Sequence, residues 1–167
     1  MSARVLIAGI GNIFQGDDAF GVEVVRRLMM QAMPEEIDVR DFGIRGFDLA
    51  YAMMESWELV ILVDVMQRGG APGTLYVLEH IDDFRPANEL QPHGMDPISA
   101  LELTKALGGT IPPTIVIGCE PQELGGADGV MGLSAAVNGA IGPAIKLVLA
   151  RAEQVLQRAS LAQELNA

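Results

Sequence analysis

Three acidic side chains and one histidine stand where they could bind a metal ion or move a proton. Asp17 and Asp18 lie side by side in GIGNIFQGDDAFGVEVV, residues 9–25, between a strand-like and a helix-like segment. Asp64 is near the end of the apolar run LVILVDV, where a carboxylate is costly to desolvate without a partner. His93 precedes a predicted helix, on a loop next to a glycine. Carboxylate oxygens and an imidazole nitrogen are ligands that suit nickel, zinc or iron, and such a metal can activate water.

Each of these side chains also has an ordinary structural role available. Asp17 is expected to cap the helix that follows, because a carboxylate there accepts backbone N–H groups and faces the positive end of the helix dipole. Asp18 is not needed for capping, and two adjacent carboxylates repel each other unless something cationic lies nearby. Asp64 can instead accept bonds from loop amides, and His93 can simply be solvated. Because Asp18, Asp64 and His93 lie far apart in sequence, spacing alone leaves these alternatives open.

Two other polar residues are assigned to structure. Asp96 followed by Pro97 is typical of a helix N-cap and the first helical position. His80 follows a predicted strand and has no chemical partner beside it, so we expect it at the surface.

Apolar periodicity predicts the elements that would hold these side chains. The first, third and fifth predicted strands are nearly continuous apolar runs rich in Val and Ile, which is typical of strands covered on both faces. Helical patterns lie between most of the strands, and the last is either one long helix or a helix broken near Gly142 and Pro143. Strands are predicted at residues 4–10, 37–42, 59–65, 74–79 and 114–119, and helices at 18–32, 47–56, 97–107 and 134–158.

The alternation of strands and helices predicts an α/β fold, a three-layer αβα sandwich. Its sheet would have about five strands, mostly parallel and twisted, with helices on both faces. Only MQRGGAPG, residues 66–73, separates the third strand from the fourth, which is too short for a parallel crossover and suits a hairpin. We therefore expect one antiparallel strand. Ligands bind beyond the carboxyl ends of the parallel strands in such sheets, so the functional residues are expected there.

Composition favours a single globular domain, residues 1–167, of which half is hydrophobic and a fifth is charged. The net charge of -11 argues against nucleic acid, whose phosphates it would repel, and is compatible with a basic or metal-carrying partner. No apolar run approaches the roughly 18–20 residues that span a bilayer, so no membrane insertion is expected. The N-terminus has no signal-peptide pattern and Cys119 is the single cysteine, so we expect a cytoplasmic protein without an internal disulfide.

Several common mechanisms lack their sequence patterns. A dinucleotide fingerprint would need a third glycine at Phe14, and no Walker A pattern occurs, so no nucleotide cofactor is expected. No Ser or Cys sits in a nucleophile elbow, and Cys119 is expected in the core or a pocket wall. No His-Glu-x-x-His occurs, which excludes an ordinary zinc protease.

The stretch GIGNIFQGDDAFGVEVV resembles the opening of the endopeptidases that mature nickel–iron hydrogenases. LVILVDVMQ is similar to that family's second signature, a buried strand ending in Asp, and HGMD places His93 where the family has its single histidine. GIRGFDLAYAM, TIVIGCEP and GLS before the last helix also resemble family segments, so the likeness runs over nearly the whole chain. Two positions depart from it: Asp18 is Glu in some relatives, and Ala19 is Gly in many.

The resemblance implies a metal-contacting triad of Asp18, Asp64 and His93, with Asp18 and Asp64 as the catalytic residues of an aspartic-type endopeptidase. The metal would be nickel already inserted in the hydrogenase large-subunit precursor, whose C-terminal extension is removed. Nickel would then arrive with the substrate, and an unloaded precursor would lack the ligand that docks it. Arg45 and Glu120 are further candidates for contacting the substrate. A solvated loop and a bond to local backbone are their respective alternatives.

The attacking water could be polarised by the metal or deprotonated by either carboxylate, and the residues leave both routes open. Two alternative functions would be served by the same site: that of a non-proteolytic nickel-binding accessory protein, and that of a hydrolase acting on a small molecule. We expect a monomer, because a protease that embraces a large precursor does not need to dimerise. Gly43 and Gly46 are expected to permit turns.

Overall fold

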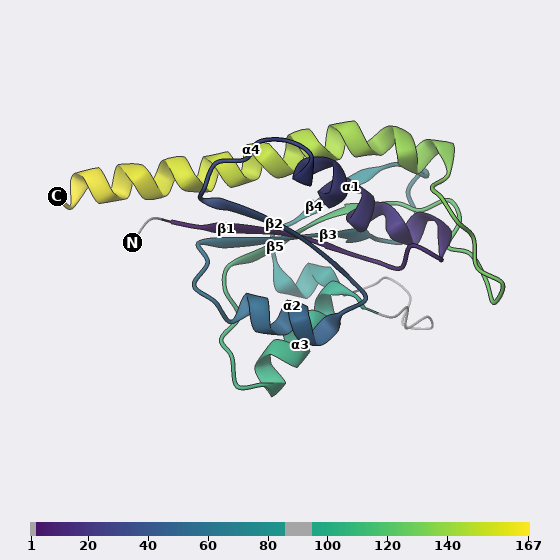
Figure 1. The fold of residues 1–167 in the computed structure, drawn as a ribbon, viewed down its shortest axis with the longest axis horizontal. Helices are drawn as coiled ribbons and strands as arrows, with labels where there is room; N and C mark the ends of the chain where they lie inside the picture. The colour runs from purple at the N-terminus through teal and green to yellow at the C-terminus, as the bar shows by residue number, and fades with distance from the viewer. Residues whose placement is uncertain (1–2, 86–94) are drawn as a thin grey trace.

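A sheet lies between two layers of helices in the computed structural model, which describes residues 3–85 and 95–167 (Figure 1). The strands are β1 Val5–Ile10, β2 Ile37–Gly43, β3 Leu59–Val65, β4 Leu75–Leu78 and β5 Thr114–Cys119. The α-helices are α1 Phe20–Met29, α2 Gly46–Met53, α3 Pro97–Ala106 and α4 Ala135–Leu165, and the 3-10 turns are η1 Gly16–Ala19 and η2 Ile81–Phe84. The five predicted strands and the αβα architecture are confirmed. No helix in the described parts of the chain is long and apolar enough to cross a membrane.

The strand order is β2-β1-β3-β5-β4, with every pairing parallel except β4 with β5. One antiparallel strand was predicted, and it is present. The predicted hairpin between β3 and β4 is wrong, because β5 lies between them. The connecting segment only passes the end of β5, where the Met66 N–H donates to Cys119 O and the Gly73 N–H donates to Glu120 O. A short segment is long enough to cross the end of one strand, and β4 then runs antiparallel to β5 along the edge of the sheet.

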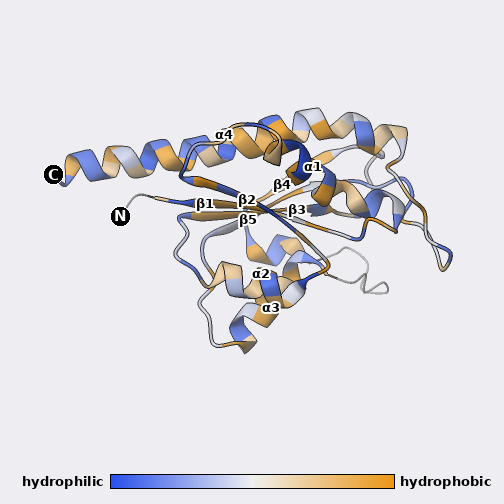
Figure 2. Ribbon diagram, in the orientation of Figure 1, coloured by the Kyte–Doolittle hydropathy of each residue, from blue (hydrophilic) through white to orange (hydrophobic). Residues whose placement is uncertain are grey.

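Each face of the sheet has its own hydrophobic core. Alternate residues of β1 divide between the two cores, with Val5 and Ile7 on one face and Leu6 and Ala8 on the other. Helices α1 and α4 cover the first face, and α2, α3 and η2 cover the second (Figure 1). β1 and β5 are buried along their whole length, and in Figure 2 the helices alternate hydrophobic and hydrophilic colours, as expected for helices that cover a buried sheet.

Helix α4 is continuous through Pro143, so the alternative of a break there is not realised, and the helix extends beyond the predicted end at 158. Pro143 is exposed, so its missing N–H bond lies on the solvent side of the helix. A buried stripe at three- and four-residue spacing holds the helix to the sheet as far as Ala152. Val155 and Leu156 also pack against this core, and the helix then projects past the sheet (Figure 1).

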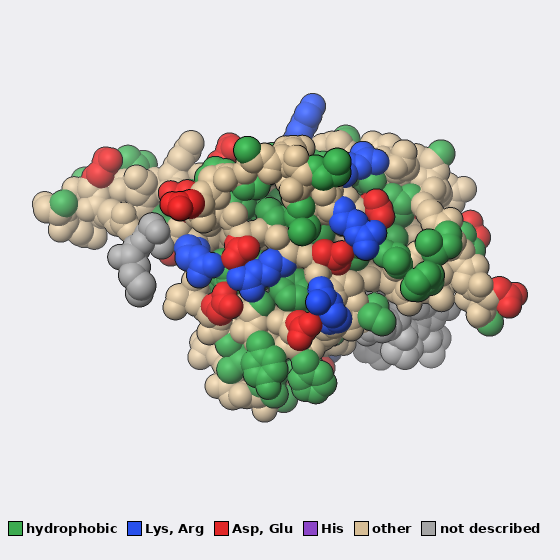
Figure 3. All heavy atoms as spheres, in the orientation of Figure 1, with side chains coloured by type: hydrophobic (Ala, Val, Ile, Leu, Met, Phe, Trp, Pro, Cys, Tyr) green, Lys and Arg blue, Asp and Glu red, His purple; other side chains and the backbone are tan. Residues whose placement is uncertain are grey.

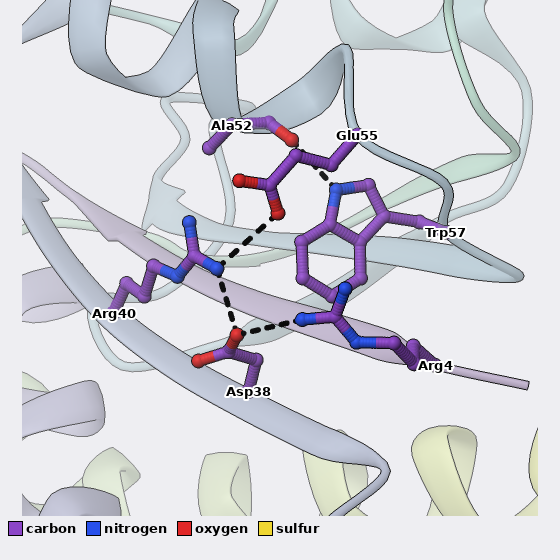
Figure 4. A network of polar contacts seen from close by, with 6 residues as sticks. All are labelled: Arg4, Asp38, Arg40, Ala52, Glu55 and Trp57. Atoms are coloured by element: carbon purple, nitrogen blue, oxygen red, sulfur yellow. Dashed lines mark hydrogen bonds and ion pairs between the residues drawn. The ribbon is translucent and has the colours of Figure 1, made fainter. Parts of the chain in front are cut away.

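At the amino ends of the strands, a polar network joins β1, β2 and the end of α2 (Figure 4). Asp38 accepts bonds from Arg40 at 2.7 Å and Arg4 at 3.2 Å, and Arg40 also bonds Glu55 at 3.3 Å. Both guanidinium groups lie over the Trp57 ring, 4.4 and 5.5 Å from its centre. Figure 3 shows acidic and basic side chains alternating in a band across this face of the molecule.

Candidate active site

Close packing at the end of β1 brings the acidic pair of the first motif to the crevice beyond the sheet. A Cβ on Gly11, whose φ is +140°, would lie 1.8 Å from the carbonyl oxygen of Asp18. A Cβ on Gly21 in α1 would lie 2.0 Å from Val63 O on β3. Only glycine therefore lets η1 and α1 sit this tightly on the ends of β1 and β3. The glycines of the motif therefore allow the close packing that positions the carboxylates. They do not form a phosphate-binding loop.

Asp18 is partly exposed at the end of η1, and its Oδ2 accepts the backbone N–H of Asn12 at 2.9 Å. The Asn12 side chain in turn accepts the Phe14 N–H at 2.9 Å, which shapes the loop that leaves β1. Asp18 therefore lies over the carboxyl end of β1, where the sequence predicts functional residues.

Asp64 is almost completely buried at the end of β3, with 3% of its surface exposed. Its Oδ1 accepts the Val65 N–H at 2.8 Å. Burial raises the pKa of Asp64 well above 3.8, and the negative charges of Asp18 and Asp96 raise it further. Asp18 and Asp64 are thus close enough to repel each other, which is an arrangement that a cation would relieve. The structure brings these two predicted residues to one site.

The third predicted ligand, His93, lies outside the described residues. Just after that gap, the Asp96 side chain accepts the Ser99 N–H at 2.7 Å and Pro97 begins α3, so the predicted N-cap is confirmed. Within residues 3–85 and 95–167, no three His, Cys, Asp or Glu side chains are grouped so that they could hold a metal ion. The triad includes His93 and stays a prediction.

The predicted capping role of Asp17 is wrong. Residues Gly16–Ala19 wind into η1, which moves the start of α1 to Phe20, and the N-cap of α1 is Ala19 without a side-chain bond. Asp17 is buried and points instead to the loop before α4. Its carboxylate accepts four bonds, from the N–H groups of Gln122, Glu123 and Ser134 and from the Ser134 hydroxyl, at 2.7–2.9 Å. Burial acts to raise the pKa of Asp17, but these bonds together lower it below 3.8.

The two further substrate candidates make local contacts. Both oxygens of buried Glu120 accept the Arg68 N–H, at 2.8 and 3.1 Å, which holds the segment that follows β3. Arg45 is exposed, and it bonds the carbonyls of Phe42 and Asp41 and the carboxylate of Asp48.

Three other residues whose roles were predicted from the sequence lie in the described part of the chain. Cys119 is buried in the core, where burial and the charge of Asp17 raise its pKa to about 12, so it does not act as a thiolate. His80 is at the surface, as predicted. Gly43 has a φ of +53°, as a turn glycine should.

A cavity of about 310 Å³ opens at the loop that follows β1, and one of its lining residues, Asn12, bonds the Asp18 carboxylate through its backbone N–H. It is lined by residues 11–14 and 41–45 together with Val22 and Arg26 of α1. The loops that follow β1 and β2 therefore form a hollow into which a peptide segment could extend toward Asp18.

Sequence reasoning missed the partners of Asp17. Gln122 and Glu123 donate through their backbone, so no side-chain pattern announces them. Ser134 had a visible signal, because a serine ahead of a helical pattern is a typical N-cap, and it does accept the Val137 N–H.

The comparisons with known proteins agree on one family. The family model described as "Hydrogenase maturation protease" matches residues 22–151. The hydrogenase 2 maturation protease of Escherichia coli K12 is 32% identical over 155 residues, covering 88% of this chain and 89% of that protein. The solved structure of the hydrogenase maturating endopeptidase HybD from E. coli matches with a TM-score of 0.76 and 28% identity, covering 90% of this chain and 93% of that one. A hydrogenase 2 maturation peptidase from a Thaumarchaeota archaeon matches with a TM-score of 0.65 and 33% identity, covering 89% and 97%.

The chain has a mixed sheet between two layers of helices, with two carboxylates at the carboxyl ends of its strands. This is the fold of the HybD endopeptidase, so the protein belongs to that class of peptidase. The chain belongs to the hydrogenase maturation protease family.

Proposed function

We propose that this protein is the endopeptidase that removes the C-terminal extension of a nickel-loaded [NiFe] hydrogenase large-subunit precursor. Family membership supports the reaction and the class of substrate. The observation that carries the site is the pair Asp18 and Asp64. Asp64 is buried, and its burial and the negative charge of Asp18 raise its pKa, in a crevice where a cation would stabilise both carboxylates.

In this proposal the nickel is part of the substrate. Asp18, Asp64 and His93 contact the metal already seated in the precursor, and the shared coordination adds binding energy that an empty precursor cannot supply. The same contacts hold the scissile bond near a carboxylate. Arg45 would contact the C-terminal segment of the precursor, since it lines the cavity beside Asp18. Glu120 would act at the rim of the site by ordering the segment that begins at Arg68.

The aspartic-type assignment depends on where the proton of the attacking water goes. Burial and the negative charge of Asp18 raise the pKa of Asp64 in the free protein, and a nearby cation would favour the ionised carboxylate that can accept a proton. We therefore propose that a carboxylate of this pair accepts the proton while the substrate-borne nickel orients the reacting groups. We also propose that the protein works as a monomer in the cytoplasm.

Intact mass spectrometry of a large-subunit precursor tests the function directly. The precursor is incubated with the protein in two forms, with and without nickel in its active site. A single C-terminal loss confined to the nickel-loaded form is expected. Cleavage of both forms would show that nickel is not the recognition element. Cleavage of neither would leave a metal-binding accessory protein or a small-molecule hydrolase.

A further inference from the structure

Asp17, the first residue of the acidic pair, is buried and bonded to a segment that is distant in sequence. We propose that Asp17 is a positioning residue that sets the place of Asp18 by holding residues 121–134 against η1. Its effect on cleavage rests on the proposed function, whereas its effect on the position of Asp18 does not.

The four donors to the Asp17 carboxylate come from the segment ahead of α4. Oδ2 accepts the Gln122 N–H at 2.8 Å, the Glu123 N–H at 2.9 Å and the Ser134 hydroxyl at 2.9 Å. Oδ1 accepts the Ser134 N–H at 2.7 Å. Four hydrogen bonds to one buried carboxylate hold the two segments together firmly, because a buried donor that loses its acceptor is left desolvated and unpaired.

Backbone bonds connect the same two segments. The Gly16 N–H donates to Val130 O, the Asp17 N–H to Glu123 O and the Val130 N–H to Phe14 O, each at 2.8 Å. The turn that carries Asp18 is therefore docked along its length on the 121–134 segment. Neither η1 nor α1 has a side-chain cap of its own, so this docking supplies the restraint that a cap would otherwise give.

Asp18 is covalently next to Asp17 and is held on the other side of the turn. Its N–H donates to Gln15 O at 3.2 Å, and its Oδ2 accepts the Asn12 N–H at 2.9 Å. The Asn12 amide thus reports the position of the Asp18 carboxylate without any substrate present. If Asp17 holds the turn, loosening Asp17 must weaken the bond at Asn12.

Asp17→Asn is the sharpest test, because it keeps the size of the side chain and replaces one acceptor with a donor among N–H groups that also donate. Amide hydrogen exchange is measured by NMR in the free protein. Exchange is expected to accelerate roughly tenfold, the effect of losing about one hydrogen bond, at Gln122, Ser134 and also Asn12. Asp38→Asn is the matched control, since it alters a partly buried carboxylate that accepts hydrogen bonds at the other end of the sheet and should leave Asn12 unchanged.

Acceleration confined to Gln122 and Ser134, with Asn12 unchanged, would overturn the proposal and leave Asp17 as a loop anchor only. Unchanged exchange at all three amides would overturn it as well.

A double-mutant cycle then tests whether Asp17 acts on precursor binding through Asp18. The measured quantity is the affinity of each variant for the nickel-loaded precursor. Asp17→Asn is expected to weaken binding about tenfold in the wild-type background, in line with the loss of about one hydrogen bond. It should have little further effect in the Asp18→Asn background. Additive losses would contradict the coupling. If even the wild type fails to bind and cleave the precursor, the proposed function fails, and the Asn12 exchange still decides the role of Asp17.

Discussion

At the residue scale, three aspartates near one crevice behave differently because their surroundings differ. Asp17 is buried with four donors, and its pKa is lowered. Asp64 is buried, accepts the Val65 N–H and has two acidic neighbours, and its pKa is raised. Asp18 is partly exposed and accepts the Asn12 N–H. The same residue type therefore has a lowered pKa at one position and a raised pKa at another, according to how its charge is compensated.

Asp18→Ala and His93→Ala are each expected to abolish processing of the nickel-loaded precursor, because each removes a contact to the metal. Asp18 contributes little to the core, so its variant should unfold within a few degrees of the wild type. Precursor cleavage followed by mass and thermal unfolding followed by circular dichroism check the two statements. Wild-type cleavage rates in either variant would remove that residue from the site.

Asp64→Asn is expected to stop processing but to stabilise the free protein at neutral pH. The folded pKa of Asp64 lies above the unfolded value near 3.8, so its protonated form is favoured on folding. The stability that Asp64 contributes is complete below that value and is lost as the pH rises through the folded pKa. Asn does not ionise, so its advantage should grow from acid to neutral pH. Denaturant titrations across this range measure it, and a variant less stable than the wild type at neutral pH would contradict the assignment.

At the element scale, the site depends on how closely α1 approaches the sheet. Gly21 faces Val63 O and Ile10 O at distances that leave no room for a methyl group. Because η1 leads directly into α1, any outward movement of the helix also moves the carboxylate that η1 carries. Packing of α1 and geometry of the site are therefore coupled.

Gly21→Ala is expected to destabilise the fold by about 1–3 kcal/mol, the usual cost of overpacking, and to lower the cleavage rate. The matched control is Gly139→Ala on α4, where a Cβ meets nothing within 4 Å. That change should stabilise by about 0.5–1 kcal/mol, because alanine is the better helix former, and should leave activity unaltered. Urea unfolding and precursor cleavage compare the two. Equal effects of both substitutions would show that the packing of α1 is not limiting.

At the scale of the whole molecule, stability and chemistry are placed at opposite ends of the sheet. Asp18 lies beyond the carboxyl end of β1 and Asp64 at the carboxyl end of β3, whereas the network around Asp38 and Trp57 joins the amino ends. The network can therefore be weakened without touching the site.

Asp38→Asn tests this separation. The bonds from Arg40 and Arg4 lower the pKa of Asp38 despite its partial burial. The contribution of Asp38 to stability is therefore present above the unfolded pKa near 3.8 and is lost as the pH falls through the folded pKa. We expect the variant to unfold more readily than the wild type at neutral pH, with the difference shrinking in acid, and to cleave the precursor normally. A loss of cleavage in the folded variant would show that the two ends are coupled.

The sequence by itself determined the elements that depend on local pattern. Continuous apolar runs identified β1, β3 and β5, and Asp96 with Pro97 marked the start of α3. The resemblance of the ordered motifs identified the family and pointed to Asp18 and Asp64. These features were readable because periodicity, capping and motif order are properties of neighbouring residues.

Only the tertiary structure decided what distant segments do to one another. It placed β5 between β3 and β4, because the short connection can pass a strand end as easily as form a hairpin. It kept α4 continuous through Pro143, because packing on the sheet outweighs a missing bond on the solvent side. It also showed that Asp17 is a buried acceptor and not the expected helix cap. Three of its four donors are backbone N–H groups more than a hundred residues away, and a sequence pattern does not identify backbone donors.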